Sequence, residues 1–216
     1  MTLQVPARAR QIRFVSAIVV LAAIWLAMLQ WGRGPLDQTI YQALYAGGHP
    51  VLVTVARVFT ALGEPTVLIV AGFVTAVLLW RAGHRHLPWV LIGITLIGRG
   101  LSEVQKLTIA RPRPDLDPHL VVVKTSSFPS GHATSSMIFY LTIALALTAG
   151  TRWHRPAAAG AILLSLLIGL SRVMLGVHWP SDVIGGWSFG LLWVLVTLRL
   201  AGRWIAGDSR VVEKQL

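Results

Sequence analysis

The 216-residue chain has no cysteine, so it can form neither a disulfide framework nor a thiolate metal site. Charge is also scarce: 12% of the residues are charged, whereas soluble domains carry about 25%. Only 8 residues are acidic, and no acidic run, low-complexity tract or clear repeat is present. With 55% hydrophobic residues, this composition predicts an all-α polytopic membrane protein rather than a soluble domain.

The net charge of +11 would suggest a nucleic-acid partner if the protein were soluble. Here most of the 19 Lys and Arg residues lie in short loops between apolar runs. Membrane topology accounts for basic residues in such loops, so no nucleic-acid partner is expected.

Six apolar runs are predicted to cross the bilayer as helices within one domain that covers residues 1–216. They cover residues 14–31, 66–80, 87–104, 132–148, 157–177 and 183–204. A signal peptide is the alternative for the first run, but the run is long for one and lacks a small-x-small cleavage site. The mixed segment 36–62 predicts one or two interfacial helices, with an ordinary ordered loop as the alternative.

An even number of spans places both termini on the same side of the membrane. Eleven of the nineteen basic residues then lie on that side, and the positive-inside rule makes it cytoplasmic. Six of the other eight lie in or beside two segments that carry candidate site residues. The site is therefore predicted to face the periplasm or the cell exterior, in the inner membrane of a bacterium.

The first of these segments, residues 171–182, carries Arg172, His178 and Asp182 at the end of an apolar run. A carboxylate four residues after a histidine can keep one ring nitrogen protonated and leave the other free to attack an electrophile. The arginine can bind phosphate oxygens through two parallel hydrogen bonds. The alternative is that these residues only cap a membrane helix at the water interface. Gly176 and Pro180 favour an end to the helix inside this segment.

The second segment is a polar loop that opens with Lys106 and Arg113 and closes with Ser130, Gly131 and His132. A Ser-Gly pair at the start of a helix offers free backbone N–H groups and the positive end of the helix dipole to an anion. In the predicted topology both segments lie on the outer side. Three cations, a helix N-terminus and two histidines there predict a phosphate site, with one histidine as nucleophile and the other as proton donor.

Other polar residues receive less specific interpretations. No carboxylate cluster suggests a Mg²⁺ or Zn²⁺ site, so metal-free chemistry without a cofactor is expected. Arg111 is interpreted equally as an anion contact or as a loop-surface residue. Glu103 is interpreted mainly as a local ion-pair partner of Lys106, and Glu64 as a loop residue.

In order and in internal spacing, the polar segments resemble the three signature motifs of the phosphatidic acid phosphatase type 2 / vanadium haloperoxidase superfamily. The matching positions are Lys106 with Arg113-Pro114, then Pro129-Ser130-Gly131-His132, then Ser171-Arg172 with His178 and Asp182. The resemblance covers about residues 60–204 and implies that Lys106, Arg113 and Arg172 bind phosphate. It also implies that Ser130 and Gly131 add hydrogen-bond donors.

The same resemblance implies that His178 is the nucleophile that forms a phosphohistidine. It implies that Asp182 orients His178 and that His132 is the general acid. The apolar spans are similar to the integral-membrane branch, whose substrates are lipids such as undecaprenyl diphosphate, phosphatidylglycerol phosphate, phosphatidic acid or lipid A phosphates. Two alternatives remain: a vanadate-dependent haloperoxidase, although that branch is soluble, and a non-catalytic membrane transporter or binding protein, which would need no acid–nucleophile pair.

Overall fold

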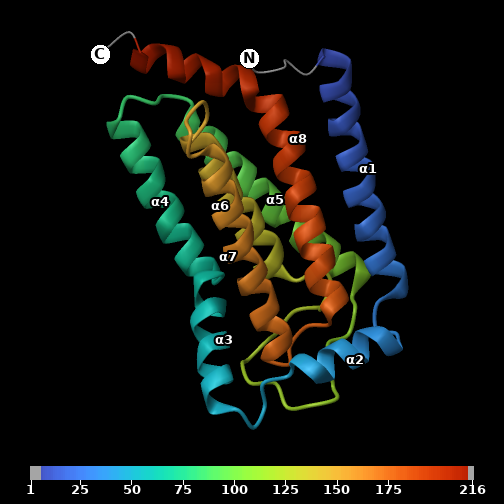
Figure 1. Ribbon diagram of the computed structural model, residues 1–216. Coiled ribbons are helices and arrows are strands. Elements are labelled where there is room, and N and C mark those ends of the chain that lie inside the picture. Colours follow the sequence, from blue (N-terminus) through green and yellow to red (C-terminus); the bar gives the residue numbers. More distant parts are fainter. Residues whose placement is uncertain (1–5, 214–216) are drawn as a thin grey trace.

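Helices make up all the regular structure in the computed structural model, which describes residues 6–213 without the side chains at 7 and 203–213. They are α1 Ala7–Trp31, α2 Pro35–Leu44, α3 Pro50–Leu62, α4 Pro65–Arg81, α5 Leu87–Ile109, α6 Gly131–Leu147, α7 His154–Met174 and α8 Pro180–Glu213. Most run along one long axis, and α2 crosses one end of the bundle (Figure 1). The all-α prediction is confirmed.

Each predicted apolar run corresponds to a helix, but not every one of these helices is long enough to cross a bilayer alone. By length and composition, four described helices, α1, α5, α7 and α8, are able to cross a bilayer alone. Helices α4 and α6 have 17 residues each, roughly 25 Å of helix, against a hydrocarbon core of about 30 Å. Helices α3 and α4 meet the same length and composition requirement only when taken together, as a fifth span that is broken and bent by 44°. The six-span layout therefore stays a prediction.

The segment between the first two apolar runs forms α2 and α3. Both helices begin with proline at their first position, where its fixed φ suits the first turn and its missing N–H costs nothing. Helix α2 packs on α7 and α8. Helix α3 packs on α7 and leads into α4 on one side of the bundle (Figure 1). This segment is therefore packed against the bundle.

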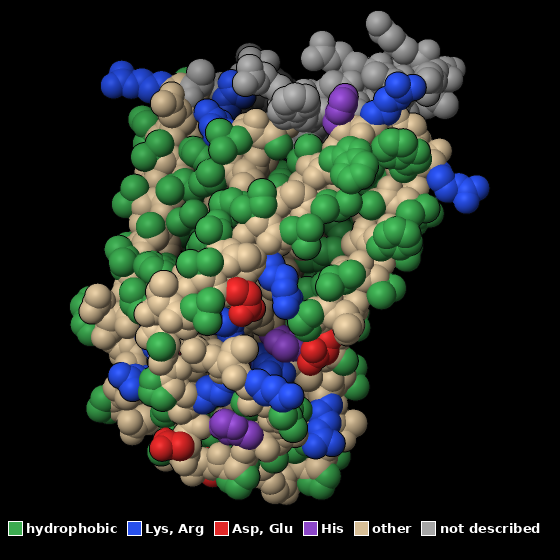
Figure 2. All heavy atoms as spheres, turned by 180° about the vertical axis from the view of Figure 1, so that it is seen from behind, with side chains coloured by type: hydrophobic (Ala, Val, Ile, Leu, Met, Phe, Trp, Pro, Cys, Tyr) green, Lys and Arg blue, Asp and Glu red, His purple; other side chains and the backbone are tan. Residues whose placement is uncertain are grey.

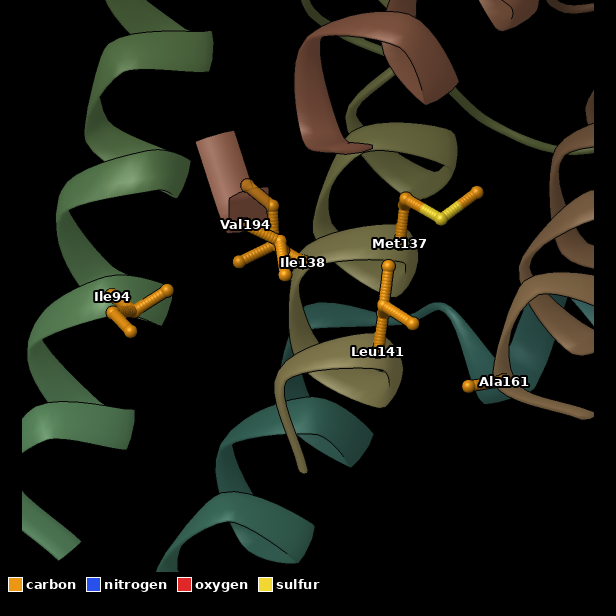
Figure 3. Close-up of a cluster of buried hydrophobic side chains, with 6 residues drawn as sticks. All are labelled: Ile94, Met137, Ile138, Leu141, Ala161 and Val194. Carbon is orange, nitrogen blue, oxygen red and sulfur yellow. The ribbon is translucent and has the colours of Figure 1, made fainter. Parts of the chain in front are cut away.

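Helix α6 lies at the centre, in contact with α4, α5, α7 and α8. Its Met137, Ile138 and Leu141 are almost fully buried. Figure 3 shows them in the cluster that also contains Ile94 of α5, Ala161 of α7 and Val194 of α8. A short helix is thus held by apolar contacts on several sides, which fixes the direction in which its N-terminus points.

Helix α8 extends past the predicted end of the sixth run, as far as Glu213. Its C-terminal part and the start of α1 lie at the same end of the bundle (Figure 1). Three of the eleven basic residues counted on the cytoplasmic side fall outside the described side chains: Arg203, Arg210 and Lys214.

Candidate active site

The turn after α7 sets the positions of Arg172 and His178. Gly176 has φ +76, a conformation that costs little only for glycine. The N–H of Gly176 donates to Val173 O and the N–H of Val177 donates to Arg172 O, which is the pattern of a Schellman motif. The helix therefore ends at Met174, and not at 177 as the apolar run predicts. Arg172 lies in its last turn, and His178 lies in the connection to α8.

His178 is held by groups from two different connections. Its Nδ1 lies 3.4 Å from Asp182 Oδ2 and 3.3 Å from Ser127 Oγ. Asp182 Oδ2 also accepts hydrogen bonds from the Ser127 hydroxyl and from the Trp179 N–H. Because the acceptors gather on the Nδ1 side, the ring proton belongs on Nδ1. The lone pair is then left on Nε2.

The free nitrogen of His178 faces Arg113. Arg113 Nη1 lies 3.2 Å from His178 Nε2 and also donates to Val177 O at 2.6 Å. Burial and the nearby Arg113 guanidinium hold the pKa of His178 well below its usual range. The imidazole is therefore neutral near pH 7, as a nitrogen nucleophile must be.

Arg113 and Lys106 share the loop residues that precede α6. Arg113 Nε donates to Thr125 O at 2.7 Å, and Lys106 Nζ donates to Ser126 O at 3.0 Å. Lys106 is almost fully buried, although it lies near the end of α5. Neither cation forms an ion pair with a carboxylate of the described residues. Their charge is therefore available to an anion.

Unpaired polar atoms lie beside these cations. Arg172 donates through Nη1 to Thr60 Oγ1 at 2.6 Å, but its buried Nε has no partner among the described residues. The buried Ser130 Oγ also lacks one there. A Cβ on Gly131 would lie 3.8 Å from Lys106 Nζ, so the first turn of α6 approaches the lysine closely. Buried donors without partners are costly, and the oxygens of a phosphate would satisfy them.

His132, in the first turn of α6, pairs with a residue that the sequence interpretation leaves in a loop. Its Nε2 lies 3.2 Å from Glu64 Oε1. Glu64 sits at the bend between α3 and α4, and a Cβ on the adjacent Gly63 would lie 3.0 Å from the His132 ring. The interpretation of Glu64 as a loop residue is incomplete, because its carboxylate contacts the candidate acid.

Arg111 is buried and not on the loop surface. Its Nη1 donates to Asp182 Oδ1 at 2.9 Å and to Ser181 Oγ at 3.0 Å. Its Nη2 donates to the carbonyl oxygens of Met28 and Leu29 at the end of α1, both at 2.8 Å. Both interpretations from sequence, an anion contact and a surface residue, are replaced by a buried ion pair with the carboxylate beside His178.

The folded chain brings most of the sequence-predicted residues to one end of the bundle, through the contacts given above. They are Lys106, Arg113, Ser130, Gly131, His132, Arg172, His178 and Asp182. Glu103 forms no ion pair with Lys106 in the described part of the chain. Sequence reasoning missed Ser127, Thr125 and Thr60, because nothing in their local pattern separates them from neighbouring hydroxyl residues.

No three His, Asp or Glu side chains within the described ranges come together as a set of metal ligands. The side chains that do gather are nitrogen donors and two histidines, each paired with a carboxylate. This donor set suits a phosphate group rather than a divalent cation.

Comparisons with known proteins agree with this chemistry. The model of the PAP2 superfamily matches residues 87–206. Phosphatidylglycerophosphatase B of Bacillus subtilis is 33% identical over 190 residues, which cover 83% of this chain and 88% of that protein. An undecaprenyl-diphosphatase of Sulfolobus acidocaldarius is 36% identical over 122 residues, 54% of this chain and 56% of that protein.

A solved structure also resembles the fold. The crystal structure of a transmembrane PAP2-type phosphatidylglycerolphosphate phosphatase from Bacillus subtilis superposes with a TM-score of 0.80 at 27% identity, covering 87% of this chain and 96% of that one. Its similarity covers helices outside the segment that the family model matches. The chain therefore belongs to the PAP2 superfamily, as a multi-pass protein embedded in the membrane.

Proposed function

We propose that this protein is a lipid phosphatase that hydrolyses a phosphate monoester or diphosphate through a phosphohistidine on His178. The observation that carries the proposal is the environment of that ring. Asp182 and Ser127 lie on the Nδ1 side, and Arg113 lies on the Nε2 side. A binding protein or transporter needs an anion site, but it does not need a neutral imidazole aimed at the bound anion.

In the proposed first step, Nε2 of His178 attacks phosphorus, and the bond from phosphorus to the leaving oxygen breaks. His132 gives that oxygen a proton. Lys106, Arg113 and Arg172, with donors from Ser130 and Gly131, bind the remaining phosphate oxygens and stabilise the five-coordinate transition state. In the second step His132 removes a proton from water, which attacks the phosphohistidine and releases inorganic phosphate.

An apolar cavity beside the site supports a lipid as the substrate. It has a volume of about 220 Å³ and lies between α4, α5 and α6. Two of its lining residues adjoin the site: Pro65 follows Glu64, and Ser135 lies one turn after His132. Figure 2 shows hydrophobic side chains over the upper half of one face and a group of charged and histidine side chains below them. An apolar tail would enter the cavity sideways from the bilayer while its headgroup reaches the cations.

Metal independence gives a direct test. Purified protein should release phosphate from phosphatidylglycerol phosphate, undecaprenyl diphosphate or phosphatidic acid in the presence of EDTA, because side chains alone supply the positive charge. Vanadate should inhibit, since it mimics five-coordinate phosphorus. Phosphate release is measured with a colorimetric assay over a lipid panel. Loss of all activity in EDTA, with recovery on adding Mg²⁺, would require another mechanism.

The outward orientation of the site is tested with single cysteines, because the natural chain has none. Cysteine at Pro118, in the loop beside the site, should react with a membrane-impermeant thiol reagent in intact cells or spheroplasts. Cysteine at Gly83, in the turn between α4 and α5, should react only after permeabilisation. The reverse labelling pattern would place the site in the cytoplasm, together with its substrate pool, and would leave the proposed chemistry unchanged.

A further inference from the structure

Arg99 is an arginine in the middle of a transmembrane helix. It lies in α5, seven residues before Lys106. Residues seven apart lie on nearly the same face of a helix, here about 10 Å apart along its axis. Arg99 therefore sits on the Lys106 side of α5, closer to the middle of the helix.

The surroundings of Arg99 do not neutralise its charge. It forms no ion pair within the described part of the chain, and Glu103, one turn further along α5, is not a partner. Arg99 lines the apolar cavity between α4, α5 and α6, and it is the one charged residue among the described residues that line it. An arginine without a carboxylate partner near the middle of a membrane-spanning helix is costly and usually has a functional reason.

The lining of the cavity indicates which ligand would offset this unfavourable energy. Its walls are otherwise apolar apart from the hydroxyls of Thr75, Thr95, Ser135 and Thr142. The cations around His178 are already assigned to the phosphate that is attacked. A positive charge further along the same helix, inside the groove for the tail, complements a second negative group between that phosphate and the tail.

We infer that Arg99 binds a second phosphate of the substrate, so that the enzyme prefers lipids with two phosphates over lipids with one. The inference rests on the proposed function and names a feature of its substrate. Two kinds of lipid carry such a second phosphate. In a lipid diphosphate the second phosphate is joined to the first through one bridging oxygen. In a phosphatidylglycerol phosphate it is a phosphodiester, separated from the terminal phosphate by one glycerol.

The test compares preference ratios between variants. The kcat/KM for farnesyl diphosphate is divided by that for farnesyl phosphate, and the kcat/KM for phosphatidylglycerol phosphate by that for phosphatidic acid. Arg99→Met should lower at least one ratio by about tenfold or more, the scale of one lost hydrogen bond to a charged group. Arg99→Lys should restore part of it. Arg57→Met is the matched control, because Arg57 donates to Leu120 O away from the cavity and should leave both ratios unchanged.

The outcomes separate the sources. A fall in the first ratio alone identifies a diphosphate, a fall in the second alone identifies the glycerol-linked phosphodiester, and a fall in both identifies a site that accepts either. Unchanged ratios in Arg99→Met would overturn the inference. The proposed function would survive if phosphate release in that variant still depended on His178.

A binding measurement keeps the inference testable without turnover. In the His178→Ala background, farnesyl diphosphate should raise the thermal midpoint more than farnesyl phosphate does, and adding Arg99→Met should remove that difference. Phosphatidylglycerol phosphate and phosphatidic acid are compared in the same way, and equal stabilisation within both lipid pairs in the His178→Ala protein would overturn the inference. If the wild type hydrolyses none of the lipids while the binding difference is present, the proposed function fails and the second-phosphate site stands.

Discussion

Replacement of His178 by alanine is expected to abolish phosphate release, by about three orders of magnitude or more, since it removes the proposed nucleophile. Brief incubation of the wild type with a ³²P-labelled lipid phosphate, followed by an alkaline quench, should trap a phosphorylated protein, because phosphohistidine is stable to base. The same experiment with His178→Ala should trap none. Normal burst-phase phosphorylation of the alanine variant would show that another residue is the nucleophile.

Two further histidine variants sharpen this result. His119→Ala is the matched control, because His119 lies in the same loop region but its Nε2 bonds to Pro114 O at 2.7 Å, away from His178. Turnover of this variant should stay near that of the wild type. His132→Ala should still form a phosphoenzyme with a good leaving group, such as a nitrophenolate, and should be slowest when the leaving oxygen needs a proton. This pattern distinguishes the proposed acid from the proposed nucleophile.

Replacement of Arg111 by leucine is expected to have the largest effect on stability. The substitution leaves Asp182, whose side chain is 0% exposed, without its ion-pair partner, and removing one member of a buried pair typically costs about 3–5 kcal/mol. The thermal midpoint in detergent should fall by roughly 6–20 °C for a protein of this size. Activity of the surviving folded fraction should also fall, because Asp182 no longer holds His178 in one orientation.

The control for this prediction is Arg57→Leu, which removes an exposed arginine with a single hydrogen bond to a backbone carbonyl and should change stability by less than about 1 kcal/mol. The double variant Arg111→Leu with Asp182→Asn should be more stable than the sum of the single effects predicts, because the unpaired buried charge is gone. Strictly additive effects would mean that the two side chains do not interact energetically.

The sequence is enough to propose the motif residues, because each motif carries its chemistry in local spacing. Their partners are different. Ser127 lies 51 positions from His178, and Arg111 lies 71 from Asp182. Glu64 lies 68 positions from His132. No periodic pattern links residues so far apart, and these pairs depend on the packing of α4, α5, α7 and α8 around α6.

The ends of the helices and the number of spans are also features that the sequence does not predict fully. An apolar run does not reveal that Gly176 will take a positive φ, so the run 157–177 continues past the end of α7 at Met174. Likewise, hydropathy does not reveal that α3 and α4 form one bent unit. Both features depend on backbone conformation at one or two residues, whereas hydropathy averages over many.

The bonds from Arg111 to the end of α1 have a consequence for how the protein is assembled. Met28 and Leu29 accept from the guanidinium across 83 and 82 positions of sequence, and both precede the segment 87–206 that the family model matches. A shortened polypeptide that starts at Leu87 would retain every motif residue, yet its arginine would lose two acceptors. Helix α1 also packs on α8, which carries Asp182 in its first turn. The full set of hydrogen bonds around Arg111 and Asp182 therefore needs both the first and the last helix of the protein in place.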